Sequence, residues 1–199
     1  MFKSKVFTQD EKSFLMENIR LYPLQFASEM TCNIFARCLF HLEAQTVKKS
    51  TDGSGLKQRH GNFILFLHDF QKLTTSWCWM KLALFLYQKG MDCIFMDLPG
   101  FGKSSVGENS RCPANLWERF AGQVISHALD ELEVMRTAVV AVGEGAGIAL
   151  KFMAKYPHRL TLNHVFHNPI IRENDLNKYL RKEDLERIFK SHPRPAVWI

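Results

Sequence analysis

A run of mostly apolar residues extends from 137 to 142 and is followed by a glycine at every second position: Gly143, Gly145 and Gly147. This pattern predicts a sharp turn from a buried strand into a helix, because glycine accepts backbone conformations that other residues avoid. A serine, cysteine or threonine at the apex of such a turn can act as a nucleophile on a carbonyl group. Residues 139–150 contain none of these three types, so the turn is predicted without its usual chemistry.

Two further clusters of polar and glycine residues follow apolar runs. His68, Asp69 and Phe70 come directly after the run 63–67, and the loop 97–104 comes directly after the run 91–96. The run 63–67 is continuously apolar, which is typical of a strand that is buried on both faces of a parallel sheet, and 91–96 is predicted as the next strand. The three clusters are therefore expected to meet at the carboxyl edge of one sheet, where such folds place their ligands.

The order and spacing of these segments resemble the α/β-hydrolases, which have an HG turn, a D-x-x-G-x-G-x-S loop and a G-x-S-x-G nucleophile elbow after successive strands. The resemblance covers residues 61–199. It implies that the His68–Phe70 turn is a vestigial oxyanion turn, with a carboxylate at Asp69 where glycine is expected and where it would repel anions. It also implies a structural loop at the mouth of the site, formed by Asp97, Gly100, Gly102 and Ser104.

Alignment with G-x-S-x-G gives the turn the form of a vestigial nucleophile elbow. Placing Gly143 and Gly147 on the two motif glycines puts Gly145 at the nucleophile position, where a side chain is absent. Glu144 is expected to point away from the substrate position, and the N–H of Ala146 is expected to be an oxyanion donor. If both motif glycines are required, Gly147→Val should destabilise the fold strongly.

The remaining catalytic roles are also without candidates. In the family, the acid commonly follows the strand that corresponds to residues 195–199, and the histidine follows a later strand. The histidines after the elbow lie before that point, and Asp175 alone could take an earlier acid position. We therefore predict no catalytic residue, and interpret these histidines as surface or loop residues: His158, His164, His167 and His192.

A phosphate-binding loop is the rival interpretation of Gly102-Lys103-Ser104. The spacing excludes it, because G-x-x-x-x-G-K-[ST] requires glycine where Asp97 stands. The net charge of +6 and pI near 9.1 are only mildly basic, with both signs interleaved near the C-terminus. Nucleic-acid binding is therefore not expected.

The remaining pattern predicts an α/β fold, a mainly parallel sheet flanked by helices, in a single domain. Residues 1–60 are expected to contain a helix over 8–26 ended by Pro23, and a hairpin around the polar turn 48–55. Residues 61–199 are expected to alternate strand and helix. Helices are predicted over 74–89, 116–135, 148–156 and 176–190. The first of these should end at a C-cap at Gly90, and the second should begin with the capping pair Asn115 and Glu118. Further strands are predicted over 160–166 and from 196.

Composition favours an intracellular, cytoplasmic protein. The five cysteines show no CxxC pairing, which suggests reduced thiols rather than a metal site, and no cofactor is expected. No apolar run approaches the ~20 residues of a membrane span, and no secretory signal is visible.

These observations lead to the hypothesis of a pseudoenzyme that acts as a structural or scaffolding subunit. The sequence ends within a predicted strand, so the resemblance implies a fold that lacks the C-terminal strand and helix. A protein partner is expected to cover the sheet edge this exposes. The alternatives are a hydrolase with an unconventional or partner-completed site, and a small-ligand module that uses the vestigial pocket.

Overall fold

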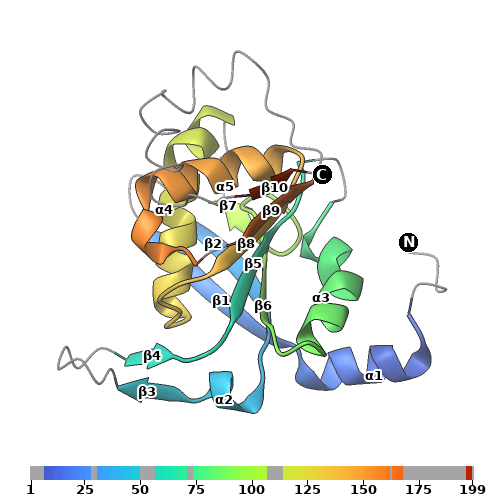
Figure 1. Ribbon diagram of the computed structural model, residues 1–199. Coiled ribbons are helices and arrows are strands. Elements are labelled where there is room, and N and C mark those ends of the chain that lie inside the picture. The colour runs from blue at the N-terminus through green and yellow to red at the C-terminus, as the bar shows by residue number, and fades with distance from the viewer. Residues whose placement is uncertain are drawn as a thin grey trace.

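A mainly parallel sheet forms the centre of the computed structural model (Figure 1). The structure describes residues 7–27, 31–49, 57–70, 74–106, 114–161, 163–167 and 196–198. The strands of the large sheet follow the order β1-β2-β6-β5-β8-β9-β10. Its parallel part consists of β5 (Phe63–Leu67), β6 (Asp92–Asp97), β8 (Ala138–Val142), β9 (His164–His167) and β10 (Ala196–Trp198).

The register of the central strands brings the three predicted clusters to one edge. Leu67 near the end of β5 pairs with Met96 of β6 and with Ala141 of β8. We call this the carboxyl edge, and we call the edge where β5, β6 and β8 begin the amino edge. The segments that follow these three strands consequently start side by side, as expected for a parallel sheet.

The N-terminal part adds antiparallel strands. β1 (Arg20–Ala27) pairs with β2 (Thr31–Leu39), and β2 pairs with both β6 and the short β7 (Ser105–Val106). The helix predicted over 8–26 is too long, because α1 (Gln9–Asn18) ends before β1 begins. Pro23 lies inside β1 at the edge of the sheet, where a residue without an N–H is tolerated.

Helices cover both faces of the sheet (Figure 1). α4 (Ala114–Glu131) and α5 (Glu144–Lys155) pack on one face, where Val124, Leu129 and Phe152 are buried with the sheet residues. α1 and α3 (Met80–Tyr87) lie on the other face, over a smaller buried cluster that includes Phe66. Packing on both faces explains why β5 is apolar along its whole length and why the four residues of β6 between Asp92 and Asp97 are apolar.

Short elements complete the described chain. A second, two-stranded sheet of β3 (Val47–Lys49) and β4 (Lys57–Arg59) confirms the hairpin predicted around 48–55. The other short elements are α2 (Leu42–Gln45) and the 3-10 turns η1 (Ser76–Trp79) and η2 (Pro157–Arg159).

The predicted alternation of strand and helix from residue 63 is confirmed over the described segments. Gly90 follows α3 with a φ of 85°, as a C-terminal glycine should. Three helix bounds were wrong: α3 starts at Met80 rather than at 74, α4 ends at Glu131 rather than at 135, and α5 starts at Glu144 rather than at 148. The helix predicted over 176–190 and the side chains of the capping pair Asn115 and Glu118 lie outside the described part.

Candidate functional site: the elbow at the carboxyl edge

The turn between β8 and α5 is made by Gly143 alone. β8 ends at Val142, α5 begins at Glu144, and Gly143 between them has φ 57° and ψ −129°. Its N–H donates to the carbonyl of His167 at 3.3 Å, which ties the turn to the end of β9. A positive φ is the region that favours glycine, so the residue type at the apex agrees with its conformation.

The predicted alignment of the elbow was therefore wrong by two residues. Gly145 does not stand at the apex but in the first turn of α5, and Gly147 lies further along this helix. The N–H of Ala146 donates to the Gly143 carbonyl at 3.2 Å and belongs to the helix. With Gly143 at the apex, Ala141 takes the first glycine position of the motif and Gly145 takes the last, so only one of the two motif glycines is matched. Glycine is required at 145 because a Cβ there would overlap the carbonyl oxygen of His68.

Asp69 fills the space above the apex. Its side chain is buried, and its Oδ1 accepts the N–H of Phe70 at 2.8 Å and the N–H of Glu144 at 3.1 Å. One donor comes from the loop after β5 and the other from the start of α5. A Cβ built on Gly143 would overlap this carboxylate, so Asp69 occupies the volume that an apex side chain would need.

Glu144 faces the same carboxylate. It was expected to point away, but a hydrogen bond with Asp69, followed by burial, raises the pKa of Glu144 above its ordinary value of 4.5. Its Oε2 is buried and has no hydrogen-bond partner among the described residues. These features fit a carboxyl group that retains its proton beside a carboxylate.

His68 connects the turn after β5 to the loop after β6. Its Nδ1 lies 2.7 Å from the carbonyl of Asp69, and its Nε2 accepts the N–H of Leu98 at 3.0 Å. An accepting Nε2 requires the proton on Nδ1, and burial lowers the pKa of His68. Both ring nitrogens are engaged, so the ring acts as a neutral structural link.

Asp97 organises the loop predicted at the mouth of the site. This fully buried residue accepts hydrogen bonds from the N–H and hydroxyl of Ser76, from Arg37 at 2.8 Å, and from the N–H of Lys103 at 3.1 Å. Burial by itself would raise its pKa, but the bonds from Ser76, Arg37 and Lys103 outweigh it and lower the pKa of Asp97. Through these hydrogen bonds the Asp97 carboxylate holds β2, η1 and the loop together.

The other loop residues surround Asp97. Gly102 has a φ of 56°, and a Cβ there would overlap the Asp97 carboxylate, whereas Gly100 has a φ of 84° in open space. The hydroxyl of Ser104 donates to the Asp97 carbonyl at 2.5 Å and accepts the N–H of Phe35 at 2.9 Å. In these contacts the loop residues shape the backbone.

The histidines after the elbow differ from one another. His158 and His167 are exposed, as expected. His164 is fully buried in β9, where its Nδ1 accepts the N–H of Val139, so its interpretation as a surface or loop residue was wrong. His192 and Asp175 lie outside the described part of the chain.

Across the described segments, no three His, Cys, Asp or Glu side chains gather closely enough to hold a metal ion. None of the described helices is long and apolar enough to cross a membrane.

Comparison with known proteins gives one significant sequence relative. No family model matches the chain. The human protein ABHD14A is 27% identical over 105 residues, which are 53% of this chain and 37% of that protein. The chain thus spans well under half of this curated relative.

Solved structures agree on the architecture. A probable hydrolytic enzyme from Pseudomonas aeruginosa superposes with a TM-score of 0.55 at 22% identity, over 76% of this chain and 42% of that one. A predicted CIB-like hydrolase from Thermoplasma acidophilum gives 0.59 at 17% identity, over 91% and 87%. The chain has the α/β-hydrolase fold.

Within the α/β-hydrolase fold, the oxyanion hole uses the N–H after the nucleophile and an N–H from the loop after the strand that corresponds to β5. With Gly143 at the apex, these donors are Glu144 and Phe70, not Ala146. Both donate to Asp69 Oδ1. The carboxylate that was expected to repel anions therefore accepts the two N–H groups that correspond to the oxyanion donors of the fold.

The sequence contained a signal for this arrangement. Asp69 is larger than the glycine expected in the HG turn, and Gly143 is smaller than the nucleophile expected at the apex. These two positions face each other across the elbow, so the larger side chain at 69 fills the volume that the missing side chain at 143 leaves. The two changes lie 74 residues apart and become a pair only when the elbow register is known.

Proposed function

We propose that this α/β-hydrolase-fold chain does not hydrolyse substrates and acts through contacts with other proteins. The observation that carries the proposal is the pair formed by Gly143 and Asp69. The apex has no side chain to attack a carbonyl, and both elbow donors bind an oxygen of the chain itself. Nucleophilic attack and oxyanion stabilisation, the two contributions of an elbow, are then missing together.

A tethered carboxylate is a strong competitor for these donors. Asp69 needs no loss of translational freedom to bind, whereas a carbonyl or small anion from solution does. A ligand would also have to break the hydrogen bond between Asp69 and Glu144, which is the largest cause of the raised pKa of Glu144. The same argument disfavours a small-ligand module at this elbow.

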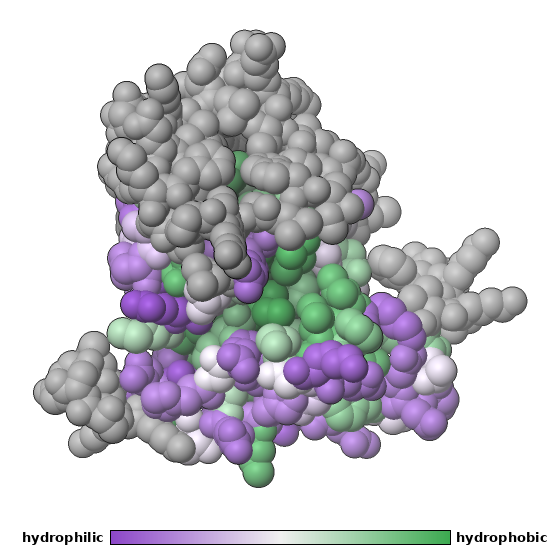
Figure 2. All heavy atoms as spheres, in the orientation of Figure 1, coloured by the Kyte–Doolittle hydropathy of each residue, from purple (hydrophilic) through white to green (hydrophobic). Residues whose placement is uncertain are grey.

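An exposed apolar surface supports contacts with other proteins. Trp77 of η1 and Leu82 and Phe85 of α3 are 44%, 40% and 55% exposed. Figure 2 shows apolar side chains gathered in the middle of this view, where Figure 1 places the central strands and α3. Clustered apolar residues on a surface commonly mark protein-interaction sites.

A second candidate is a hydrolase that uses Asp69 itself. Its carboxylate lies where an apex side chain would be, and carboxylates serve as nucleophiles in some enzymes. In this case the Asp69 carboxylate would attack an electrophilic carbon while its Oδ1 accepts the two N–H groups. This candidate requires the Asp69 side chain for turnover, and that requirement separates it from the first.

The deciding experiment measures hydrolysis of 4-nitrophenyl acetate by the purified chain, its Asp69→Asn variant and a denatured sample. The first proposal expects equal, background rates in all three, and an equal rate for the exposed-site control Asp10→Asn. Turnover well above the denatured sample that Asp69→Asn abolishes and Asp10→Asn retains would establish the second candidate instead.

A further inference from the structure

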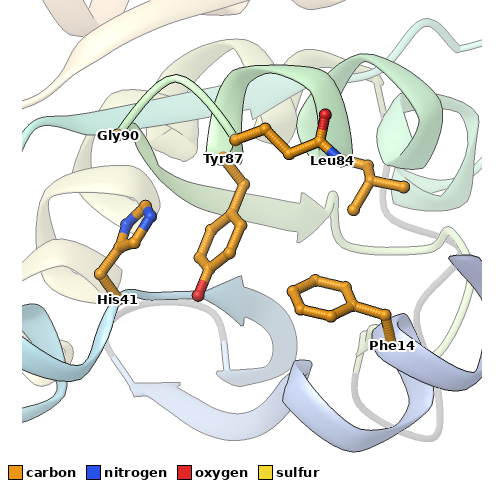
Figure 3. A pocket seen from close by; sticks show the side chains of 6 residues that line it. Phe14, His41, Leu84, Tyr87 and Gly90 are labelled. Carbon is orange, nitrogen blue, oxygen red and sulfur yellow. The ribbon is translucent and has the colours of Figure 1, made fainter.

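Two adjoining hollows lie at the amino edge of the sheet, whereas the elbow lies at the carboxyl edge. The first, shown in Figure 3, has a volume of about 330 Å³ and is lined by Phe14, His41, Leu84, Tyr87, Gln88 and Gly90. The second, of about 450 Å³, shares His41 and Gly90 with it. We call the two hollows together the amino-edge groove. Neither the elbow nor the proposed function uses it.

The second hollow contains a buried carboxylate with one free oxygen. Asp92, at the start of β6, is only 3% exposed. Its Oδ1 accepts the backbone N–H of His41 at 2.8 Å and lies 3.1 Å from Nδ1 of the same residue. Its Oδ2 receives no hydrogen bond from any described residue and faces Gly61, where a Cβ would overlap it.

This carboxylate oxygen can be reached from the hollow that Asp92 lines. A ligand in the hollow can therefore bond to it directly in place of water. Because a carboxylate has only acceptors, the partner must donate, and a cation satisfies both the charge and the hydrogen bond. Glu43 lines the same hollow and adds negative charge, while His60 and Asn62 complete a polar wall.

The first hollow supplies an apolar wall. Phe14 of α1 and Leu84 and Tyr87 of α3 surround it, and Figure 3 shows the rings of Phe14 and Tyr87 side by side. The ring of His41 stacks on Tyr87 with centroids 3.9 Å apart and planes 6° apart. His41 thus forms the boundary between this wall and Asp92.

We propose that the amino-edge groove binds a primary amine carried on a short apolar or aromatic stem. The ammonium group donates to Asp92 Oδ2 in the polar hollow. The stem lies along Phe14, Leu84 and the stacked His41 and Tyr87 rings, where a cation close to an aromatic face gains further stabilisation. A carboxylate or phosphate ligand is disfavoured by Asp92 and Glu43.

The test is a calorimetric titration of the full chain with 2-phenylethylamine at about pH 8, where alkylamines are ordinarily protonated. Matched probes are 2-phenylethanol, which lacks the charge, and 3-phenylpropanoate, which reverses it. We expect saturable binding of one molecule of the amine and at least about tenfold weaker binding of both other probes, as loss of a charge-assisted hydrogen bond implies.

Variants locate the site. Asp92→Asn retains an oxygen for His41 and places an amide toward the groove, so amine binding should weaken by about tenfold or more. Glu131→Gln, which removes one exposed charge from α4, should leave binding unchanged. Amine-induced NMR shifts of the His41 ring protons in the unaltered chain provide a readout that does not depend on how Asp92→Asn folds. Absence of amine binding, equal binding of the alcohol, or shifts that spare His41 would overturn the proposal.

Discussion

At the scale of single residues, the elbow is shaped by an exchange of volume between two positions. Gly143 provides no side chain, and the Asp69 carboxylate occupies the space and takes both backbone donors. The two residue types are therefore interdependent. A side chain at 143 requires a smaller residue at 69, and removal of the Asp69 carboxylate leaves two N–H groups without this acceptor.

This interdependence predicts strong coupling between substitutions at the two sites. Gly143→Ala should destabilise the fold by roughly 2–4 kcal/mol, because it combines a positive φ with overlap on Asp69. In an Asp69→Ala background the overlap disappears, so the cost should fall by about 1–3 kcal/mol. Urea unfolding of the two single variants and the double variant measures this coupling. Additive changes in the free energy of unfolding would mean that the carboxylate does not fill the apex.

The sequence predicted the elbow but not its register or its occupant. Glycine positions indicate where a chain can turn, and they match both ends of G-x-S-x-G only with Gly145 at the apex; with Gly143 at the apex, Ala141 stands at the first glycine position. The choice depends on the long-range approach of α5 to the His68 carbonyl, which local pattern does not contain. The hydrogen bond from Glu144 to Asp69 likewise joins residues that are distant in sequence.

At the scale of elements, the start of α5 packs against the end of β5. A Cβ at Gly145 would overlap the carbonyl oxygen of His68 and lie 3.0 Å from that of Leu67. These are backbone atoms at the end of β5 and of the residue that follows it, so they cannot move aside as a flexible side chain would. Gly147, on the same helix, has no neighbour within 4 Å of a Cβ position.

The two helical glycines should consequently respond in opposite directions to alanine. Gly145→Ala should lower the melting temperature and cost roughly 2–4 kcal/mol, because α5 must shift away from β5. Gly147→Ala should be neutral or stabilise by up to about 1 kcal/mol, because alanine is the better helix former. Thermal unfolding of both variants provides the measurement. A larger loss at Gly147 would favour the original alignment, in which that residue was a motif glycine.

The sequence predicted the parallel core better than the N-terminal part. β5, β6 and β8 are short runs of apolar residues between turn signals, and burial on both faces produces that pattern. β1 was missed because Pro23 was interpreted as a helix end, although an edge strand also accepts proline. Edge pairing is a tertiary property, so the local residue types could not distinguish these alternatives.

At the scale of the whole molecule, stability depends on pH through groups that titrate differently when folded. The pKa of Asp97 is lowered, so its stabilising contribution is present above its unfolded value and is lost as pH falls. The pKa of His68 is also lowered, so protonation at acid pH opposes folding. The contribution of Glu144 to stability depends on pH in the opposite direction: its pKa is raised, so this contribution is lost as pH rises.

The Glu144 contribution can be isolated by comparing the chain with Glu144→Gln, which keeps the shape but removes the titration. Below about pH 4.5 Glu144 is protonated in both the folded and unfolded chain, so its proton linkage there is small. As pH rises, the unfolded chain ionises this group freely while the folded chain must ionise it beside Asp69. The free energy of unfolding of Glu144→Gln should therefore increase relative to that of the original chain between about pH 5 and pH 8. Urea unfolding at several pH values gives both curves, and Asp97 and His68 contribute equally to each. Parallel curves would show that Glu144 does not share its proton with Asp69, and a difference of the opposite sign would show that its folded pKa is lowered.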